Sequence, residues 1–213
     1  MTAATRNIDA VLLAAGLSRR MGDENKLLLP FGGEPLVRHT ATMLMNAGFR
    51  QVVVVTGHDA REVEAALDGL DLSVSFNPHF ASGQMSSVVH GLHALKEREV
   101  PAKGVMIALA DMPYLQTSDY CDLSRMFFSS GADFIIVPEY LDQRGNPVIL
   151  PQSQIAAATS GGLNTGCRKL IGNHPERVRA VAVNNSAFVR DIDTAADYGR
   201  ALKSAFPTAP CCG

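Results

Sequence analysis

The sequence predicts an α/β fold, in which a Rossmann-like, mostly parallel mixed sheet is flanked by helices. Short, continuously apolar stretches recur along the chain, and they suit strands that are buried on both faces of a parallel sheet. Stretches with apolar residues at helical spacing lie between them. Two of the apolar stretches end in small and charged residues, at the position where open α/β sheets bind ligands.

The first half of the chain alternates predicted strands with predicted helices. Residues 8–15 are apolar apart from Asp9, and residues 51–56 contain four consecutive valines, so both stretches are expected to be buried strands. The other segments are, in order, an extended piece at 26–31 with a turn at Gly32 and Gly33, a helix over 36–47 ended by Gly48, a helix over 59–69 capped by Asp59, a short strand at 72–76 and a helix that begins after Gly83.

The second half continues the alternation. Its segments are, in order, a strand at 105–110 that ends at Asp111, a helix over 118–128, a strand at 133–138, a loop at 142–147, a short strand at 148–150, short helices over 151–173 broken by Gly161 and Gly162, an alternating strand at 178–183 and a closing helix from Thr194 through Leu202. We expect a single domain over residues 1–213. Within it, residues 140–175 are the least regular and are expected to form a small lobe over the sheet.

Composition excludes several classes of protein. With 46% hydrophobic and 19% charged residues, the chain has a globular balance and is not expected to be disordered. A net charge of -2 argues against a broad basic surface for nucleic acid. The sequence contains no apolar run long enough to cross a bilayer and no signal-peptide pattern, so we expect a cytoplasmic protein without a membrane partner.

Cysteines and histidines give no metal pattern. The four cysteines lack zinc-site spacing; they are Cys121, Cys167, Cys211 and Cys212. The last two are expected to lie in a mobile tail, with a redox or metal role as the alternative. His90 and His93 lie three residues apart on a predicted helix, but the sequence suggests no third ligand, so zinc is not expected.

The loop after the first strand has the composition of a phosphate site. Gly16, Ser18, Arg20 and Lys26 follow the strand within a few residues. Small residues let a backbone approach an anion, whose charge exposed N–H groups and basic side chains can then balance. The stretch is neither a Walker A loop nor a G-x-G-x-x-G fingerprint. The alternative is an ordinary turn with exposed arginines.

Two acidic segments follow predicted strands and suit a metal ion. Asp111 comes directly after the strand at 105–110, and Asp191 and Asp193 would project to the same side of an extended segment. Carboxylates that face a phosphate site are typical Mg²⁺ ligands. The alternatives are that Asp111 caps a turn before Pro113 and that Asp193 caps the last helix.

Further polar residues are candidates for substrate contacts. One group precedes a predicted helix and could contact a base or ribose, or merely cap that helix: Asn77, Gly83, Ser86 and Ser87. A second group could meet an anionic acceptor: Arg144, Asn146 and Arg168. For each of these arginines, solvation at the surface is the alternative. The sequence contains no G-x-S-x-G elbow, so serine hydrolysis is not supported.

The loop resembles a known family signature. Leu13 to Lys26 matches the pattern L-A-A-G-x-S-x-R-M-G-x-x-x-K of the MobA-like nucleotidyltransferases, and within them it is most similar to the molybdenum cofactor cytidylyltransferases. The resemblance spans residues 8–202. Later matches follow in the same order, at residues 77–78, 83–87, 110–113, 145–147 and 191–194.

The resemblance implies a fold of the nucleotide-diphospho-sugar transferase type and an Mg²⁺-dependent transfer reaction. The terminal phosphate of the molybdenum cofactor, molybdopterin, would attack the α-phosphate of a nucleoside triphosphate and release pyrophosphate. The implied nucleotide-binding residues are Leu13, Ala14, Ala15, Gly16, Ser18, Arg20 and Lys26, together with Asn77, Gly83, Ser86 and Ser87. Arg20, Lys26 and Asp111 would be catalytic, and Asp111 and Asp193 would bind the metal.

Substrate choice is expected from two further positions. Relatives that use CTP resemble the L-A-A-G form, and relatives that use GTP resemble the L-A-G-G form. A Cβ at Ala15 narrows the space beside the backbone, which favours the smaller pyrimidine over a purine. The acceptor segment at 161–168 departs from many relatives, because it lacks an acidic residue near Asn164. The alternatives are a guanylyltransferase, a transferase for another phosphorylated acceptor such as a sugar phosphate, and a non-catalytic cofactor carrier. A molybdenum hydroxylase or its chaperone would be the partner that receives the product.

Overall fold

The central sheet confirms the predicted fold class. The structure is a computed structural model and describes residues 3–22, 24–96, 99–160 and 175–205. The strands of the sheet run in the order β10 (Val178–Ala182), β7 (Ile135–Tyr140), β9 (Val148–Pro151), β6 (Gly104–Leu109), β1 (Ile8–Ala14), β4 (Val52–Thr56) and β5 (Ser73–Phe76), and β8 (Gln143–Arg144) pairs with β7. β9 is antiparallel to its neighbours β6 and β7, and β8 is antiparallel to β7. The other pairings in this sheet are parallel, so the sheet is mixed but mostly parallel.

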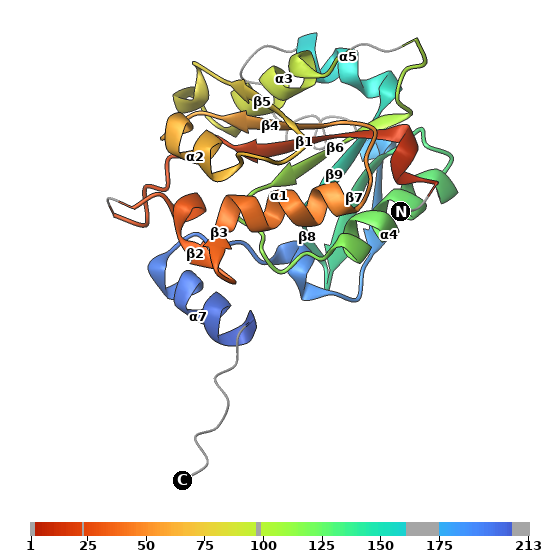
Figure 1. Ribbon diagram of the computed structural model, residues 1–213. Helices are drawn as coiled ribbons and strands as arrows, with labels where there is room; N and C mark the ends of the chain where they lie inside the picture. The colour runs from red at the N-terminus through yellow and green to blue at the C-terminus, as the bar shows by residue number, and fades with distance from the viewer. Residues whose placement is uncertain (1–2, 23, 97–98, 161–174, 206–213) are drawn as a thin grey trace.

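Helices cover both faces of the sheet (Figure 1). α1 (Leu36–Asn46) and α4 (Thr117–Ser129) lie together on one face, and α3 (Gln84–Ala94) and α5 (Gln152–Ser160) lie together on the other. The remaining described elements are α2 (Ala60–Ala66), α7 (Ala195–Ala205), the hairpin of β2 (Pro30–Phe31) and β3 (Glu34–Pro35), and the 3-10 turns η1 (Thr5–Asn7), η2 (Lys26–Leu28), η3 (Phe80–Ser82), η4 (Pro175–Arg177) and η5 (Ser186–Val189). None of the helices in these described ranges is long and apolar enough to span a membrane.

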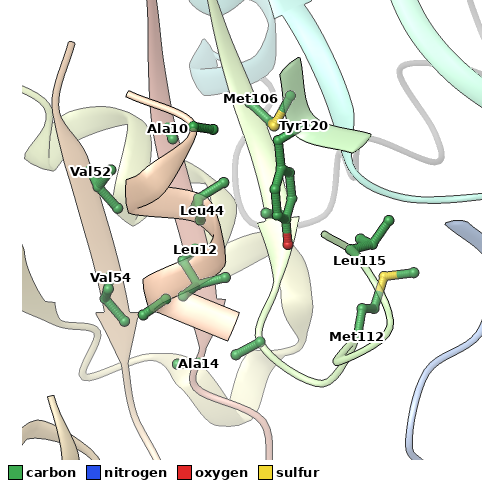
Figure 2. Packing of buried hydrophobic residues seen from close by; sticks show 14 of the residues in the cluster. Ala10, Leu12, Ala14, Leu44, Val52, Val54, Met106, Met112, Leu115 and Tyr120 are labelled. Carbon is green, nitrogen blue, oxygen red and sulfur yellow. The ribbon is translucent and has the colours of Figure 1, made fainter. Parts of the chain in front are cut away.

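Alternation along β1 divides the core into two layers. Ala10, Leu12 and Ala14 are buried on the face covered by α1 and α4, whereas Val11 and Leu13 are buried on the face covered by α3. β4 alternates in the same way. Figure 2 shows the first layer, in which these side chains meet residues of α1 and α4. Because both faces are covered, β1 and β4 are buried along their whole length and are apolar except at Asp9 and Thr56.

Gly91 lets α3 lie very close to the sheet. A Cβ at this position would come within 2.4 Å of Val11 Cγ1, so α3 could not keep its place with a larger residue. This close packing fixes the amino-terminal end of α3 above the carboxyl ends of β1 and β4. The start of α3 therefore becomes a wall of the candidate site.

Several predicted elements differ in detail from the structure. The expected extended piece at 26–31 begins as the 3-10 turn η2, because the Asn25 side chain accepts a hydrogen bond from Leu27 N and closes a tight turn. Asp59 precedes α2 but does not cap it through its side chain, since it lies in the left-handed region at φ 49° and accepts a hydrogen bond from Asn25. The predicted loop at 142–147 contains the short strand β8.

The predicted lobe over 140–175 remains a prediction. Its residues 161–174 lie outside the described residues, while β9, which belongs to the same stretch, is an inner strand of the main sheet. The cysteine pair at 211–212 also lies outside them. Thr194 caps the closing helix as predicted: its hydroxyl accepts a hydrogen bond from Asp197 N at 3.2 Å, and the Asp197 side chain accepts one from Thr194 N.

Candidate active site

A cavity of about 590 Å³ opens at the carboxyl ends of β1 and β6. Four segments that are far apart in the sequence enclose it: the loop after β1, the start of α3, the segment that follows β6 and the segment that follows η5. Its lining residues are Leu13, Ala15, Gly16, Leu17, Ser18, Arg19, Arg20, Lys26, Leu27, Phe80, Ala81, Gly83, Gln84, Ser87, Leu109, Asp111, Asp191 and Asp193. The cavity therefore lies where an open α/β sheet is expected to bind a ligand.

Side-chain hydrogen bonds hold the loop after β1 in shape. Ser18 adopts a left-handed backbone conformation with φ 48°. Its hydroxyl donates to Asn25 Oδ1 at 3.3 Å and accepts from Lys26 N at 3.2 Å, and Asn25 in turn donates to Asp59. No described residue accepts a hydrogen bond from the backbone N–H of Gly16 or Leu17. These donors lie beside the cavity and are available to an anion.

Lys26 joins the loop to the acidic segments. Its Nζ lies 2.6 Å from Asp111 Oδ2 and 3.1 Å from Asp193 Oδ1, and the residue is only 8% exposed. Burial alone would lower the pKa of Lys26, but the charges and hydrogen bonds of Asp111 and Asp193 outweigh it and leave this pKa above its usual value. Lys26 is therefore a cation throughout the physiological range. Arg20 adds a second positive charge, with Nη2 2.8 Å from Asp193 Oδ2.

Three carboxylates converge beside this lysine. Asp111, Asp191 and Asp193 each offer an oxygen, and these oxygens lie within 4.8 Å of one another. Burial and then the charges of Asp111 and Asp193 raise the pKa of Asp191, as expected for anions held close together. The buried Asp111 Oδ1 has no hydrogen-bond partner in the described part of the chain. Oxygen donors in this arrangement fit a divalent cation such as Mg²⁺ or Mn²⁺.

The structure contradicts both alternative roles of the acidic residues, in which they would act as caps. Asp111 does not cap a turn, because its Oδ2 accepts a hydrogen bond from Lys26. Asp193 does not cap the last helix, because its carboxylate pairs with Arg20 and Lys26 while Thr194 provides the cap. Both carboxylates thus face the cavity.

The opposite end of the cavity is less polar. Gly83 begins α3 with φ 111°, a conformation that residues with a Cβ rarely adopt, and nothing lies within 4 Å of the position where its Cβ would be. Ala15, Phe80 and Ser87 line the same region. The Ser87 hydroxyl accepts a hydrogen bond from Asn77 Nδ2 at 3.1 Å. A flat ring with polar edges suits a wall of this kind.

Three residues predicted to bind the nucleotide do not line the cavity. The Ala14 side chain points to the opposite face of the sheet, because successive residues of a strand alternate. Asn77 is 1% exposed, and its amide already bonds to Ser86, Ser87 and the backbone N–H of His79. The Ser86 hydroxyl donates toward His79 O and Gly83 O. Asn77 and Ser86 therefore brace the start of α3.

Arg144 and Asn146, two of the three predicted acceptor residues, do not line this cavity. Arg144 is exposed on β8 and is not among the cavity residues. Asn146 donates its backbone N–H to Phe188 O at 2.8 Å, which ties this loop to η5. Arg168 lies outside the described residues. The eight other predicted nucleotide-binding residues line the cavity: Leu13, Ala15, Gly16, Ser18, Arg20, Lys26, Gly83 and Ser87.

Other residues of the cavity had no strong local signal. Phe80 and Leu109 look like core residues in the sequence, and Gln84 looks like an ordinary first residue of a helix, yet all three line the cavity. Asp191 differs from these residues because the sequence did contain a signal for it. One residue separates Asp191 from Asp193, and this spacing predicts that both carboxylates project to the same side of an extended segment.

Comparison with known proteins places this geometry among nucleotidyltransferases. The family model described as the MobA-like NTP transferase domain matches residues 10–178. The chain is 28% identical to nicotine blue oxidoreductase of Paenarthrobacter nicotinovorans, over 92% of this chain and 96% of that protein. It is also 28% identical to molybdenum cofactor cytidylyltransferase of Escherichia coli, over 90% of this chain and 93% of that protein.

Other matches are partial or structural. Bifunctional protein GlmU of Rhizobium etli is 31% identical over 63% of this chain, but the match spans only 29% of GlmU. A nucleotidyl transferase from Methanothermobacter superposes with a TM-score of 0.76 at 24% identity, over 93% of this chain and 97% of that chain. The Mycobacterium tuberculosis protein Rv0371C, in complex with manganese, superposes with a TM-score of 0.71 at 28% identity, over 92% and 98%.

Proposed function

The chain belongs to the MobA-like NTP transferase family, and from this premise we propose that it transfers CMP from CTP to the terminal phosphate of molybdopterin. An oxygen of the acceptor phosphate forms a bond to the α-phosphorus of CTP. The bond from that phosphorus to the bridging oxygen breaks, and pyrophosphate leaves. The acceptor is already an anion, so no general base is needed to activate it.

One observation carries the proposal: the basic loop and the acidic segments meet in a single cavity. Gly16, Ser18, Arg20 and Lys26 line this cavity together with Asp111 and Asp193, and Lys26 contacts both carboxylates directly. Phosphoryl transfer depends mainly on positioning and on electrostatic stabilisation of the phosphoryl oxygens, and this set of charges can supply both. A non-catalytic carrier would not need acidic residues beside a phosphate loop.

A divalent cation is part of the proposal. Asp111 and Asp193 would hold it, and Asp191 offers a third oxygen. When bound, such an ion neutralises charge on the phosphates of the nucleotide. The unpaired Asp111 Oδ1 supports a divalent metal at this site. The manganese complex of Rv0371C supports divalent-metal binding by a similar protein. Mg²⁺ is the ion that we propose for this chain.

CTP is the proposed nucleotide because of Ala15. This residue lines the cavity and is only 6% exposed, so its methyl group narrows the region near Phe80. A pyrimidine needs less room there than a purine. The E. coli cytidylyltransferase supports the choice of both CTP and the molybdenum cofactor. The partial match to GlmU favours a sugar phosphate as the second acceptor to test.

The decisive experiment measures pyrophosphate release with Mg²⁺ and molybdopterin, using CTP, GTP or ATP. The proposal expects release with CTP and at least tenfold less with the other two. The variant Asp111→Asn should lose turnover while its thermal unfolding stays close to that of the wild type. Asp71→Asn is a matched control, because Asp71 is exposed and precedes β5 at the opposite edge of the sheet.

Each outcome has a separate meaning. Release with GTP alone would overturn the choice of base but keep the acceptor. Release with a sugar phosphate and not with molybdopterin would overturn the acceptor. Binding of molybdopterin without release from any nucleotide would favour a carrier. Wild-type turnover in Asp111→Asn would remove this carboxylate from the reaction.

A further inference from the structure

A second, smaller cavity of about 250 Å³ adjoins the candidate active site. It is lined by Tyr114, Val189, Arg190, Asp191, Asp197 and Arg200. Asp191 lines both cavities, so it forms part of the boundary between them. A group in the second cavity would therefore lie next to the carboxylates Asp111 and Asp193. The proposed reaction requires an acceptor phosphate to approach the nucleotide in this manner.

Arg190 is oriented in the second cavity by an aromatic ring. Its guanidinium carbon lies 3.8 Å from the centroid of the Tyr114 ring. The side chain is half-buried, and no carboxylate in the described part of the chain forms an ion pair with it. Stacking occupies the face of a guanidinium and leaves the N–H donors at its edge available. A planar, pre-oriented set of donors is suited to bind a phosphate through two hydrogen bonds.

Two other arginines near the site are already paired with carboxylates. Arg20 forms an ion pair with Asp193, and Arg200 forms one with Asp197 on the edge of the second cavity. Their charges are therefore partly neutralised by neighbouring carboxylates. Arg190 keeps a positive charge for a ligand from outside the chain. Two phosphates that approach each other repel, and a cation on the acceptor side reduces this repulsion.

The loop that was predicted to bind the acceptor is attached to this wall. Asn146 donates its backbone N–H to Phe188 O at 2.8 Å, and Phe188 is followed by Val189 and Arg190. Gly145 makes the attachment possible, since a Cβ there would lie 2.2 Å from Phe188 O. The loop after β8 and the wall of the second cavity thus form one unit.

We propose that the second cavity binds the phosphate of the acceptor substrate, with Arg190 as the residue that binds it. Tyr114 is a positioning residue, which holds the guanidinium flat. The inference rests on the proposed function, because an acceptor phosphate exists only if the chain is a nucleotidyltransferase of the proposed kind. It extends that function by assigning the binding of the acceptor phosphate to Tyr114 and Arg190.

The test compares Arg190→Gln with the wild type in three measurements. Pyrophosphate release gives the KM for molybdopterin, calorimetry gives the Kd for CTP with Mg²⁺, and ultrafiltration gives direct binding of molybdopterin. The inference expects at least a tenfold increase in the KM and Kd for molybdopterin, with the Kd for CTP within twofold. Arg190→Lys should recover part of the affinity, because it restores the charge but not the paired donors.

Two further variants separate binding from structure. Arg179→Gln is the matched control: Arg179 also lies over an aromatic ring, 4.3 Å from the centroid of Phe134, but on β10 and away from both cavities. It should leave all three measurements unchanged. Tyr114→Leu should raise the KM for molybdopterin by less than Arg190→Gln does, and should leave the Kd for CTP unchanged.

The outcomes also distinguish this inference from the proposed function. If the wild type turns over molybdopterin and Arg190→Gln keeps its KM within twofold, the inference is overturned and the proposed function stands. An equal loss of CTP affinity in Arg190→Gln would also overturn it, because the residue would then act on the nucleotide or the fold. If the wild type neither binds nor turns over molybdopterin, both are overturned.

Discussion

Lys26 Nζ lies 2.6 Å from Asp111 Oδ2, although the two residues are 85 positions apart in the sequence. The same ammonium also lies 3.1 Å from Asp193 Oδ1. One lysine from the loop after β1 thus forms ion pairs with both of the carboxylates that we propose as metal ligands. A metal ion held by Asp111 and Asp193 would compete with this ammonium for the same oxygens, so the arrangement would couple the loop after β1 to the proposed metal site.

This competition predicts that Lys26→Met binds Mn²⁺ more tightly than the wild type in the absence of nucleotide. The substitution keeps the length of the side chain but removes the charge that holds Asp111 and Asp193. We expect about tenfold tighter binding, which corresponds to roughly 1.4 kcal/mol. Turnover should fall, because the proposed contact of Lys26 with the triphosphate is also lost. Electron paramagnetic resonance of free Mn²⁺ measures the affinity.

Lys103→Met is the control for charge alone. Lys103 precedes β6, at the end of the strand opposite to the candidate site, and its side chain is exposed. The Lys103→Met variant should bind Mn²⁺ with the same affinity as the wild type. Weaker binding of Mn²⁺ by Lys26→Met would contradict the prediction and would mean that the lysine supports the metal site.

The choice of base can be tested at Ala15. Removing its methyl group widens the cavity near Phe80, so Ala15→Gly should raise the ratio of GTP to CTP turnover by about tenfold, equal to roughly 1.4 kcal/mol of discrimination. The matched control is Ala14→Gly, because the Ala14 side chain points to the other face of the sheet. The measurement is kcat/KM for each nucleotide. An unchanged ratio in Ala15→Gly would show that the base is selected elsewhere.

The sequence predicted the fold well because the relevant signals are local. Buried strands such as 51–56 and helix ends such as Gly48 are recognisable from neighbouring residues alone. The acidic segments could also be found, since Asp111 directly follows a buried strand. The residues that pair with these carboxylates could not be predicted from local patterns. Lys26 and Asp193, for example, are 167 positions apart and come together only in the folded chain.

The sequence did not reveal which of the polar residues are buried. Asn77 has the residue type and position of a ligand contact, but it is almost completely buried, and its amide nitrogen and oxygen both form hydrogen bonds within the protein. Arg190 and Tyr114 show the reverse case. Nothing in their neighbouring residues distinguishes them from surface residues, and only their stacking across 76 positions of sequence brings them to a cavity.

Tyr120 should be replaceable by phenylalanine with a gain in stability. It is completely buried among the apolar side chains of Figure 2, and its hydroxyl has no hydrogen-bond partner among the described residues. An unpaired buried hydroxyl costs about 1–3 kcal/mol. Tyr120→Phe should therefore raise the free energy of unfolding by about 1 kcal/mol, or Tm by about 2–4 °C.

Tyr198→Phe provides the contrast for this measurement. The Tyr198 hydroxyl donates a hydrogen bond to Pro30 O, so its removal should lower stability by about 0.5–1 kcal/mol. Denaturant unfolding of both variants gives the two values. A loss of stability in Tyr120→Phe as large as that in Tyr198→Phe would mean that the Tyr120 hydroxyl has a partner.

His90 should make stability depend on pH. Burial, followed by the positive charges of His93 and His79, lowers the pKa of His90 below its usual value near 6.5. The folded protein therefore binds fewer protons at this position than the unfolded chain does. By linkage, its contribution is favourable at high pH and is lost as the pH falls from about 7.5 through 6.5 toward the folded pKa.

His90→Gln should remove this part of the pH dependence. Gln can still bond to Ser75, whose hydroxyl lies 2.9 Å from His90 Nε2, so the variant should keep the packing of α3 against β5. Between pH 7.5 and 5.5 the wild type should lose stability relative to His90→Gln, by less than about 1 kcal/mol because the side chain is only partly buried. His93→Gln, which removes one of the two neighbouring charges, should reduce the same loss without abolishing it. Denaturant unfolding across this range checks the sign, and curves that stay parallel for the wild type and His90→Gln would contradict the lowered pKa.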